Sequence, residues 1–226
     1  SGVLLAAKDN FAPLPASAVH TFCHAVPGKW YQMGVILAAT DSLNWLARNL
    51  GKDAAALSNA LGDRISGPNA MQFLPYLSGE RTPHNDSAVR GAFLNIDISA
   101  TCDDLTQSVM EGVSFALRDS LEALKLTGTN LTRALAIGGG SQSSYWLELV
   151  ATVLDLPLDV PEKGEFGAAL GAARLAIIGA TGAQPDAVMT PPKIARTIHP
   201  RTDLSADYSA AYDRYRSTYP VLKALP

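Results

Sequence analysis

The stretch LAIGGGSQS, residues 135–143, decides the fold. Its apolar run Leu135–Ile137 predicts a short buried strand, and the three glycines that follow predict a turn. Apolar residues at helical spacing begin directly after the turn, at Tyr145, Trp146, Leu149, Val150 and Val153. A strand, a glycine turn and a helix in this order are typical of an α/β domain.

The glycine turn is also the first candidate for a ligand site. Glycine lets the backbone approach a ligand closely, and a helix N-terminus offers unpaired N–H groups and the positive end of a dipole. The turn therefore predicts a nucleotide site, although such a turn can equally be a packing device. Two known patterns do not fit it. The Rossmann fingerprint has Gly or Ala where this chain has Ser143, although Asp159 stands at about the distance expected for the acidic residue of that fingerprint. The Walker A motif is excluded because no Lys-Ser or Lys-Thr pair follows the glycines.

Composition limits the class of protein. The chain has 226 residues, 47% of them hydrophobic, which is enough for a sizeable core. A net charge of −3 without a block of Lys or Arg argues against a nucleic-acid partner. No apolar run of about 18 residues predicts a membrane span, and the start SGVLL lacks the basic region of a signal peptide. Two cysteines do not make a disulfide framework, so we expect a cytoplasmic protein without membrane contact.

The first half of the chain opens with strand signals that give way to helical spacing. Gly51 is typical of a helix C-cap, and Asp53 is typical of an N-cap. A polar loop follows the last strand of this half and runs to about Arg90. The predicted elements are strands at 3–7, 19–25 and 30–33, a helix at 35–50, a short helix after Asp53, and a buried strand at 72–77.

The second half alternates helices and strands. Thr101 and Asp104 form a capping-box-like start, and the helix behind them carries Leu105, Val109, Val113, Leu117, Leu121 and Leu124. The further predicted elements are the strand to Ile137, a helix to Leu154, a strand at 158–160, a small-residue helix at 167–178 packed on a sheet, and a C-terminal helix with Tyr208, Ala211, Tyr215 and Leu222. The pattern predicts a β-meander followed by βα units, with a mixed sheet flanked by helices.

Most acidic residues have structural interpretations. Glu111 falls within the long amphipathic helix, and Asp103 and Asp104 resemble capping residues. Glu80 and Arg81 are expected to form an ion pair that orders their loop. An interdomain or nucleotide role for that pair is the alternative.

The histidines and tryptophans are weighed in the same way. His20, Cys23 and His24 suggest a metal site, but residues four apart on a strand are about 13 Å apart, which favours packing or hydrogen bonding. No metal site is therefore expected. His84 lies in the polar loop, within possible reach of a cleft. The three tryptophans are expected to be core or domain-contact residues: Trp30, Trp45 and Trp146.

Several segments together resemble the FGGY family of carbohydrate kinases. The loop FLPYLSGERTPH, residues 73–84, is similar to a motif of that family, and its wording is most like the xylulose kinase branch. The segments GAFLNI (91–96) and DLTQSVME (104–111) are similar to its second signature, with Asn95 where that pattern has Gly. Further similar segments occur in the same order along the chain: AVHTFCH (18–24), GGG (138–140) and GAALGAA (167–173).

This resemblance implies a fold and a ligand. It implies an actin-like ATPase domain of the ribonuclease H-like type, the C-terminal half of a kinase that uses ATP and Mg²⁺ to phosphorylate D-xylulose. In the family, such a domain follows a sugar-binding N-terminal domain. The implied ATP-binding residues are Ser1 and Gly2 near the phosphates, and Gly138, Gly139, Gly140, Ser141, Gln142 and Ser143 near the adenosine.

The resemblance also implies that some parts lie upstream of Ser1. These are the N-terminal domain, the first strand of this domain, the catalytic aspartate and most of the first phosphate loop, so no catalytic residue is expected within residues 1–226. We therefore expect the chain alone to be inactive, and Val3 and Leu5 to be uncovered. A homodimer is a further possibility. Two alternatives to a xylulose kinase stay open, a non-catalytic actin-like ATP-binding or interaction module and an FGGY kinase for another sugar or polyol.

Overall fold

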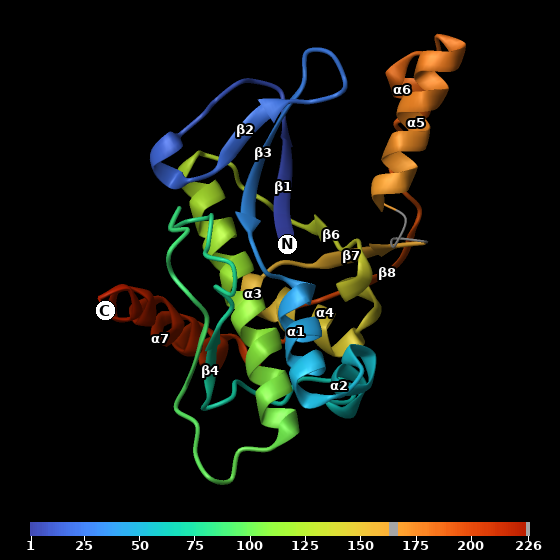
Figure 1. Ribbon diagram of the computed structural model, residues 1–226. Helices are drawn as coiled ribbons and strands as arrows, with labels where there is room; N and C mark the ends of the chain where they lie inside the picture. Colours follow the sequence, from blue (N-terminus) through green and yellow to red (C-terminus); the bar gives the residue numbers. More distant parts are fainter. Residues whose placement is uncertain (163–166, 225–226) are drawn as a thin grey trace.

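The computed structural model describes residues 1–162 and 167–224. Figure 1 shows its helices and strands in chain order. The strands are β1 (Gly2–Lys8), β2 (His20–Cys23), β3 (Trp30–Ile36), β4 (Gln72–Leu74), β5 (Ala92–Leu94), β6 (Ala134–Leu135), β7 (Leu158–Pro161) and β8 (Ile194–Ile198). The α-helices are α1 (Thr40–Leu50), α2 (Ala54–Ala60), α3 (Cys102–Leu126), α4 (Ser144–Leu154), α5 (Gly167–Thr181), α6 (Pro185–Val188) and α7 (Ser205–Lys223).

The described strands form three small sheets. The first is antiparallel with the order β1-β3-β2, the second pairs β4 with β5, and the third has the order β6-β7-β8. Only the third sheet is mixed, because β6 runs parallel to β7 while β8 runs antiparallel to it. The predicted β-meander is wrong, because β3 and not β2 is the central strand of the first sheet. Both β1 and β6 are therefore edge strands, each with one side free of pairing in the described residues.

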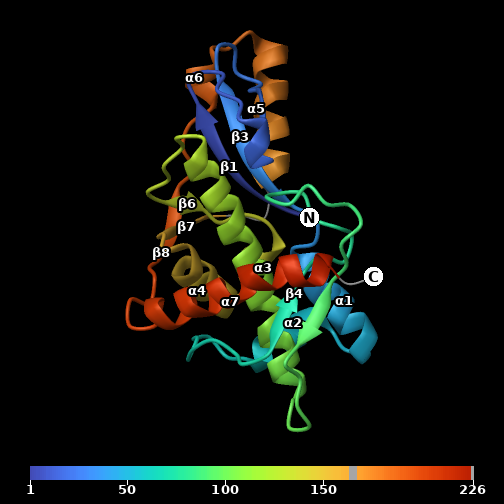
Figure 2. The same ribbon diagram turned by 90° about the vertical axis from the view of Figure 1, so that its left-hand side faces the viewer.

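Helix α3 is the centre of the core. Thr101 and Asp104 form the predicted capping box at its start, with the Thr101 hydroxyl accepting from the Asp104 N–H. Most of its residues from Thr106 to Leu124 are buried. The two orthogonal views show one end of α3 beside the first sheet and the rest of the helix running among α1, α4 and α7 (Figures 1 and 2). The predicted helix is thus confirmed, and it packs against the first two sheets and against α1, α2, α4 and α7.

Two predicted boundaries in the first half differ from the structure. The helix expected from Val35 begins only at Thr40, because Val35 and Ile36 extend β3 and pair with Val3 and Gly2 of β1. The strand expected at 72–77 ends at Leu74, where Pro75 has no N–H to donate to a ladder. The caps are as predicted: Gly51 is left-handed at φ 63°, and the Asp53 carboxylate accepts from the Ala56 N–H.

The two last long helices behave differently. Helix α7 lies on the core as expected, with Tyr208, Ala211 and Tyr215 buried. Helix α5 was expected to pack on a sheet, but none of its described residues is buried, and it stands apart beside the first sheet (Figure 1). At its first residue, Gly167, an added Cβ would lie 2.9 Å from Ile137 Cδ1. Across the described residues, no helix combines the length and apolarity needed to cross a membrane.

Candidate functional site

The glycine turn differs from its sequence prediction in two ways. The run before it is not a buried strand: Leu135 is 50% exposed and Ile137 56% exposed, because successive side chains alternate between two faces and only Ala134 and Ala136 pack against the core. A helix does not begin at once either. Gly138 turns the chain with φ 86°, a short 3-10 helix spans Gly139–Gln142, and α4 starts only at Ser144. The positive φ explains why glycine occupies position 138.

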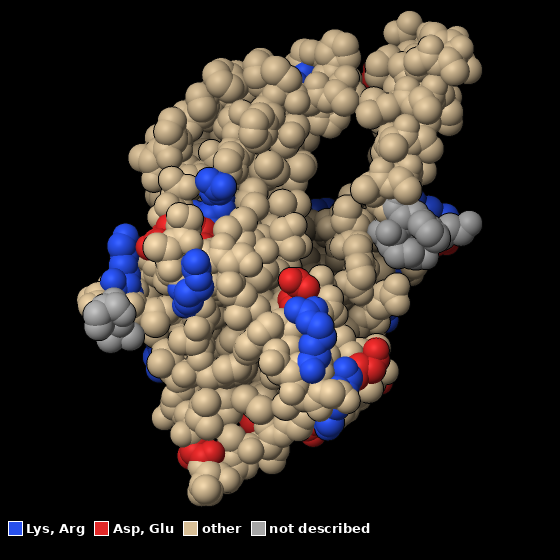
Figure 3. Space-filling view, in the orientation of Figure 1, with Lys and Arg blue, Asp and Glu red and all other residues tan. Residues whose placement is uncertain are grey.

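The turn lines a cavity of about 310 Å³, called the large cavity below. That volume is at the lower end of the range for small-molecule sites. Four parts of the chain form its walls: Ser1–Leu4 of β1, Ala39 and Thr40 at the start of α1, 134–141 after α3, and apolar residues of α3, α4 and β7. Figure 3 shows the surface hollowed between the first sheet and α5, with few charged residues around the hollow. No side chain that lines this cavity is charged.

The cavity brings together six of the eight predicted ATP-binding residues. These are Ser1, Gly2, Gly138, Gly139, Gly140 and Ser141. Gln142 is exposed and does not line the cavity. Ser143 does not line it either, because its hydroxyl caps α4 by accepting from the Trp146 N–H and from Ser58 Oγ. Residues 2 and 139 are more than a hundred positions apart in sequence, so it is the tertiary fold that brings them to the same cavity.

The start of α1 is a wall that the sequence did not indicate. An added Cβ on Gly2 would lie 2.7 Å from Ala39 Cβ, and one on Gly140 would lie 3.1 Å from Thr40 Cγ2. Both glycines therefore allow close approach of their backbones to this helix end. No side chain caps α1 at Ala39. The first N–H groups of a helix lack intrahelical partners, so this end can bind an anion.

Three buried carboxylates lie outside the cavity lining, and burial is the main cause of their raised pKa values. The pKa is raised to about 7 for Glu80, to about 7 for Glu111 and to about 6 for Asp119. The expected Glu80–Arg81 ion pair is wrong. Glu80 Oε1 accepts from the backbone N–H groups of Leu37 and Arg81, while the Arg81 guanidinium donates to Asn85. Because Glu80 is 2% exposed, it meets buried backbone donors and not a surface cation.

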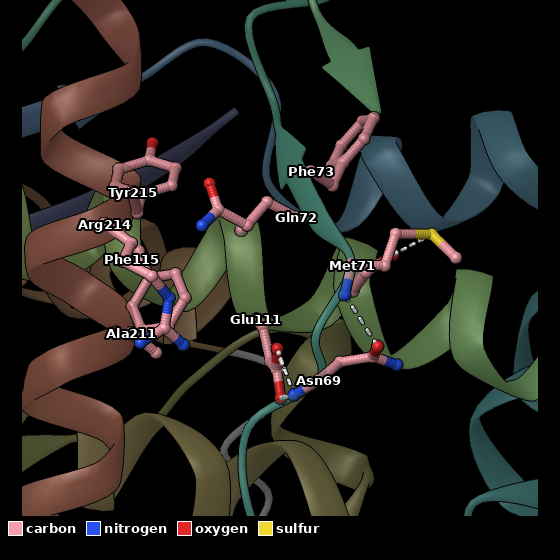
Figure 4. A pocket seen from close by; sticks show the side chains of 11 residues that line it. Asn69, Met71, Gln72, Phe73, Glu111, Phe115, Ala211, Arg214 and Tyr215 are labelled. Atoms are coloured by element: carbon pink, nitrogen blue, oxygen red, sulfur yellow. Dashed lines mark hydrogen bonds between the residues drawn. The ribbon is translucent and has the colours of Figure 1, made fainter. Parts of the chain in front are cut away.

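Glu111 lies beside a second, much smaller cavity of about 10 Å³. Figure 4 shows its carboxylate directed at the backbone of Asn69, which donates to both oxygens at 3.0 and 3.1 Å. Gln107 Nε2 donates to it as well. A space of this size holds about one water molecule, so it is no substrate site. Glu111 is thus a core residue of α3, as the sequence indicated.

We expect the Glu111 carboxylate to make stability fall as pH rises. Its folded pKa of about 7 exceeds its ordinary value of 4.5. The folded protein therefore holds the proton more tightly, and stability is lost between those two values as pH rises. The Tm of the unaltered protein should fall by several degrees relative to Glu111→Gln between about pH 5 and about pH 7.5, since 1 kcal/mol shifts such a domain by roughly 2–4 °C.

The difference between the two proteins isolates this group. Burial lowers the pKa of His84 to about 4, so this residue makes stability rise as pH rises. Both proteins contain His84, so its contribution cancels in the difference. Thermal unfolding at several pH values measures the difference. An equal pH slope in both proteins would contradict the assignment of the shift to Glu111.

The remaining side chains hold the fold together. Trp146 is buried and its Nε1–H donates to the Met110 carbonyl, and Trp45 stacks near Phe73 in the core. His24 Nδ1 accepts from the Val26 N–H, and His84 stacks on Tyr219 at 3.5 Å. Cys23 and Cys102 are free thiols, and Trp30 is half-buried against Phe11. Among residues 1–162 and 167–224, no group of three or more His, Cys, Asp or Glu side chains could hold a metal ion.

Comparison with known proteins identifies the fold. Residues 1–180 match the family described as "FGGY family of carbohydrate kinases, C-terminal domain". The crystal structure of a "xyloylose kinase" from Brucella ovis superposes with a TM-score of 0.93 and 51% identity, covering 99% of this chain and 47% of that one. A xylulose kinase from Rhodospirillum rubrum superposes with a TM-score of 0.81 and 27% identity, over 98% of this chain and 45% of that one.

A curated relative agrees with these structures. The xylulose kinase of Escherichia coli (strain K12) is 40% identical over 181 residues, which are 80% of this chain and 37% of that protein. The chain therefore spans less than half the length of the relatives it matches. The predicted fold class, an α/β actin-like ATPase domain, is confirmed by these structures.

Proposed function

The chain belongs to the FGGY family of carbohydrate kinases, and we propose that it is the ATP-binding part of a kinase that phosphorylates D-xylulose. One observation carries this proposal. Ser1–Gly2, the start of α1 and the glycine turn come from distant parts of the chain and line a single uncharged cavity. Such a cavity suits a neutral nucleoside, with phosphates held by backbone N–H groups.

In this proposal the adenosine and the phosphates of ATP contact different walls of the cavity. The adenosine lies against Gly139 and Gly140, where an added Cβ on Gly139 would meet no atom within 4 Å. The phosphates lie toward Ser1, Gly2 and the uncapped start of α1. Mg²⁺ would arrive with the nucleotide, because this ion keeps several waters and is usually bound through phosphates and one or two carboxylates.

The acceptor sugar and the catalytic carboxylate lie elsewhere in the complete protein in this proposal. Phosphoryl transfer needs a group that accepts the hydroxyl proton, and no carboxylate lines the cavity. D-Xylulose is supported by the relatives, which are described as xylulose kinases. Cytoplasmic location, a role in xylose metabolism and a homodimer stay predictions.

The test is kinetic. The complete protein should transfer phosphate from ATP to D-xylulose with saturable dependence on both, and should work far less well with other ketoses and polyols. Preference for another sugar or polyol would support the kinase activity but contradict D-xylulose as the substrate. ATP binding without phosphorylation of any sugar or polyol would favour the non-catalytic module, which the uncharged cavity lining also allows.

We further propose that the chain is one domain of the complete protein and takes one more strand beside β1. The free edges of β1 and β6 both line the large cavity, at Gly2–Leu4 and Ala134–Leu135. Its floor is apolar, formed by residues of α3 and α4 such as Val113, Leu117 and Val150. An apolar strand between the two edges would pair with both, join the first and third sheets and cover the apolar floor of the cavity. ATP would then keep only the walls at Ser1–Gly2, the start of α1 and the glycine turn.

This strand should stabilise the domain. A version that begins about ten residues before Ser1 in the complete protein should melt about 5 °C or more above residues 1–226, because each kcal/mol is worth roughly 2–4 °C. Thermal unfolding measures the difference, and size-exclusion chromatography reports whether residues 1–226 self-associate through their open edges. Equal melting temperatures for monomeric proteins would contradict the added strand.

A further inference from the structure

The loop that contains Glu80 and Thr82 lies outside the cavity lining but is hydrogen-bonded to the segment that leads into one of the cavity walls. Glu80 Oε1 accepts from the Leu37 N–H at 3.0 Å and from the Arg81 N–H at 2.7 Å. Thr82 Oγ1 accepts from the Val35 N–H at 3.0 Å, and the Thr82 N–H donates to the Val35 carbonyl at 2.9 Å. Three hydrogen bonds therefore hold the end of β3 and the residue after it.

The segment that these bonds hold leads directly into the cavity wall. Leu37 is followed by Ala38 and Ala39, and α1 begins at Thr40. Ala39 and Thr40 line the cavity, and they touch the two glycine walls at Gly2 and Gly140. Residues 37–39 form the junction between β3 and α1. A shift of this junction would therefore change the distance between the start of β1 and the glycine turn.

The loop is itself firmly placed. Glu80 and Asp86 exchange two backbone hydrogen bonds of 2.8 Å. The Asp86 carboxylate in turn accepts from Tyr219 OH of α7 at 2.8 Å. Thr82 Oγ1 also donates to the Ala18 carbonyl. These bonds fix the loop to α7 and to Ala18, and the loop in turn holds the segment that leads into α1.

Glu80 costs stability in this place. Its side chain is almost fully buried, and Oε2 has no hydrogen-bond partner. Burying a carboxyl group with one oxygen unsatisfied is unfavourable unless something else requires it. Buried residues retained at such a cost are candidates for a positioning role.

We propose that Glu80 and Thr82 are positioning residues that set nucleotide affinity by fixing the junction between β3 and α1. They touch no ligand; they act through Val35 and Leu37 on the cavity wall at Ala39 and Thr40. This inference rests on the proposed ATP site. The loop lies outside the ATP site but helps to hold the residues that line it in place.

Glu80→Ala in the complete protein is the first test. It should raise the KM for ATP about tenfold, equivalent to about 1.4 kcal/mol of binding free energy, and leave the KM for the sugar unchanged. Glu80→Gln keeps an oxygen that can accept from Leu37 and Arg81, so it should restore most of the ATP affinity.

Glu111→Ala is the matched control. Glu111 is equally buried and also accepts from a backbone N–H, but its partner is Asn69 and not a residue of the β3–α1 junction. It should lower Tm and leave the KM for ATP unchanged. A merely structural role for Glu80 would produce the same pattern in Glu80→Ala.

Thr82 gives a second test that does not depend on how Glu80 variants fold. Thr82→Val removes the acceptor for the Val35 N–H at constant shape and should raise the KM for ATP, while Thr82→Ser should not. Wild-type KM values for ATP in both Glu80→Ala and Thr82→Val would overturn this inference alone. A wild-type protein without saturable ATP dependence would overturn the proposed function and this inference with it.

Discussion

Gly139→Leu in the complete protein should raise the KM for ATP about a hundredfold, equivalent to roughly 2.7 kcal/mol of binding free energy. Gly139 lines the large cavity, and its backbone does not have the positive φ of Gly138. Its added Cβ would meet no atom within 4 Å, so the first carbon of a leucine side chain causes no clash in the fold. The leucine side chain would instead occupy the space proposed for the adenosine.

Lack of room for a side chain applies to Gly2 and Gly140, which are in close contact with Ala39 and Thr40, and not to Gly139. A variant at Gly139 therefore separates ligand binding from folding, whereas variants at the other two would disturb both. Only the first gives an unambiguous readout.

Gly179→Leu is the matched control for this experiment. Gly179 also has open space around its Cβ direction and no positive φ, but it lies on α5 away from the cavity lining. Initial rates at varied ATP, together with the Tm of each variant, measure the two effects. A folded Gly139→Leu protein with the wild-type KM for ATP would remove the glycine turn from the nucleotide site.

Local chemistry explains which features could be predicted from the sequence. The Thr101 capping box, the Gly51 C-cap and the Asp53 N-cap each depend on a few neighbouring residues, and all three were correct. The start of α1 was placed too early at Val35, because the pairing of Val35 with Val3 lies far away in sequence. Helical spacing alone could not reveal that competing partner.

The candidate site was predictable only in part, for the same reason. The glycine turn carries its own signal, since a run of three glycines after an apolar strand is unusual. Thr40 has no such signal, because a threonine at a helix start serves equally well as an ordinary first-turn residue. Its contact with Gly140 joins two distant segments and required the fold. The Glu80–Arg81 pair failed because adjacent opposite charges suggest an ion pair, whereas burial directed Glu80 to backbone donors.

Residues 1–226 alone should show no ATP-dependent phosphorylation of D-xylulose above background. A general base contributes about 10²–10⁴-fold to such a reaction and must lie within about 3 Å of the reacting hydroxyl. The large cavity has no carboxylate, histidine or lysine in its lining. Glu80, Glu111 and Asp119 are at most 4% exposed, and each has an oxygen bonded within the core, so none can reach a sugar.

Binding and turnover should separate in this chain. The cavity walls at Gly138–Ser141 and Thr40 lie within residues 1–226, so weak ATP binding should persist and can be measured by calorimetry on protein shown to be folded by circular dichroism. Release of ADP and formation of sugar phosphate, assayed beside the complete protein, measure turnover. Turnover by residues 1–226 within about a hundredfold of the complete protein would place the base among these residues, because losing a general base costs at least that factor. Binding without turnover is the outcome expected of a domain that holds the nucleotide while another part of the protein supplies the sugar and the proton acceptor.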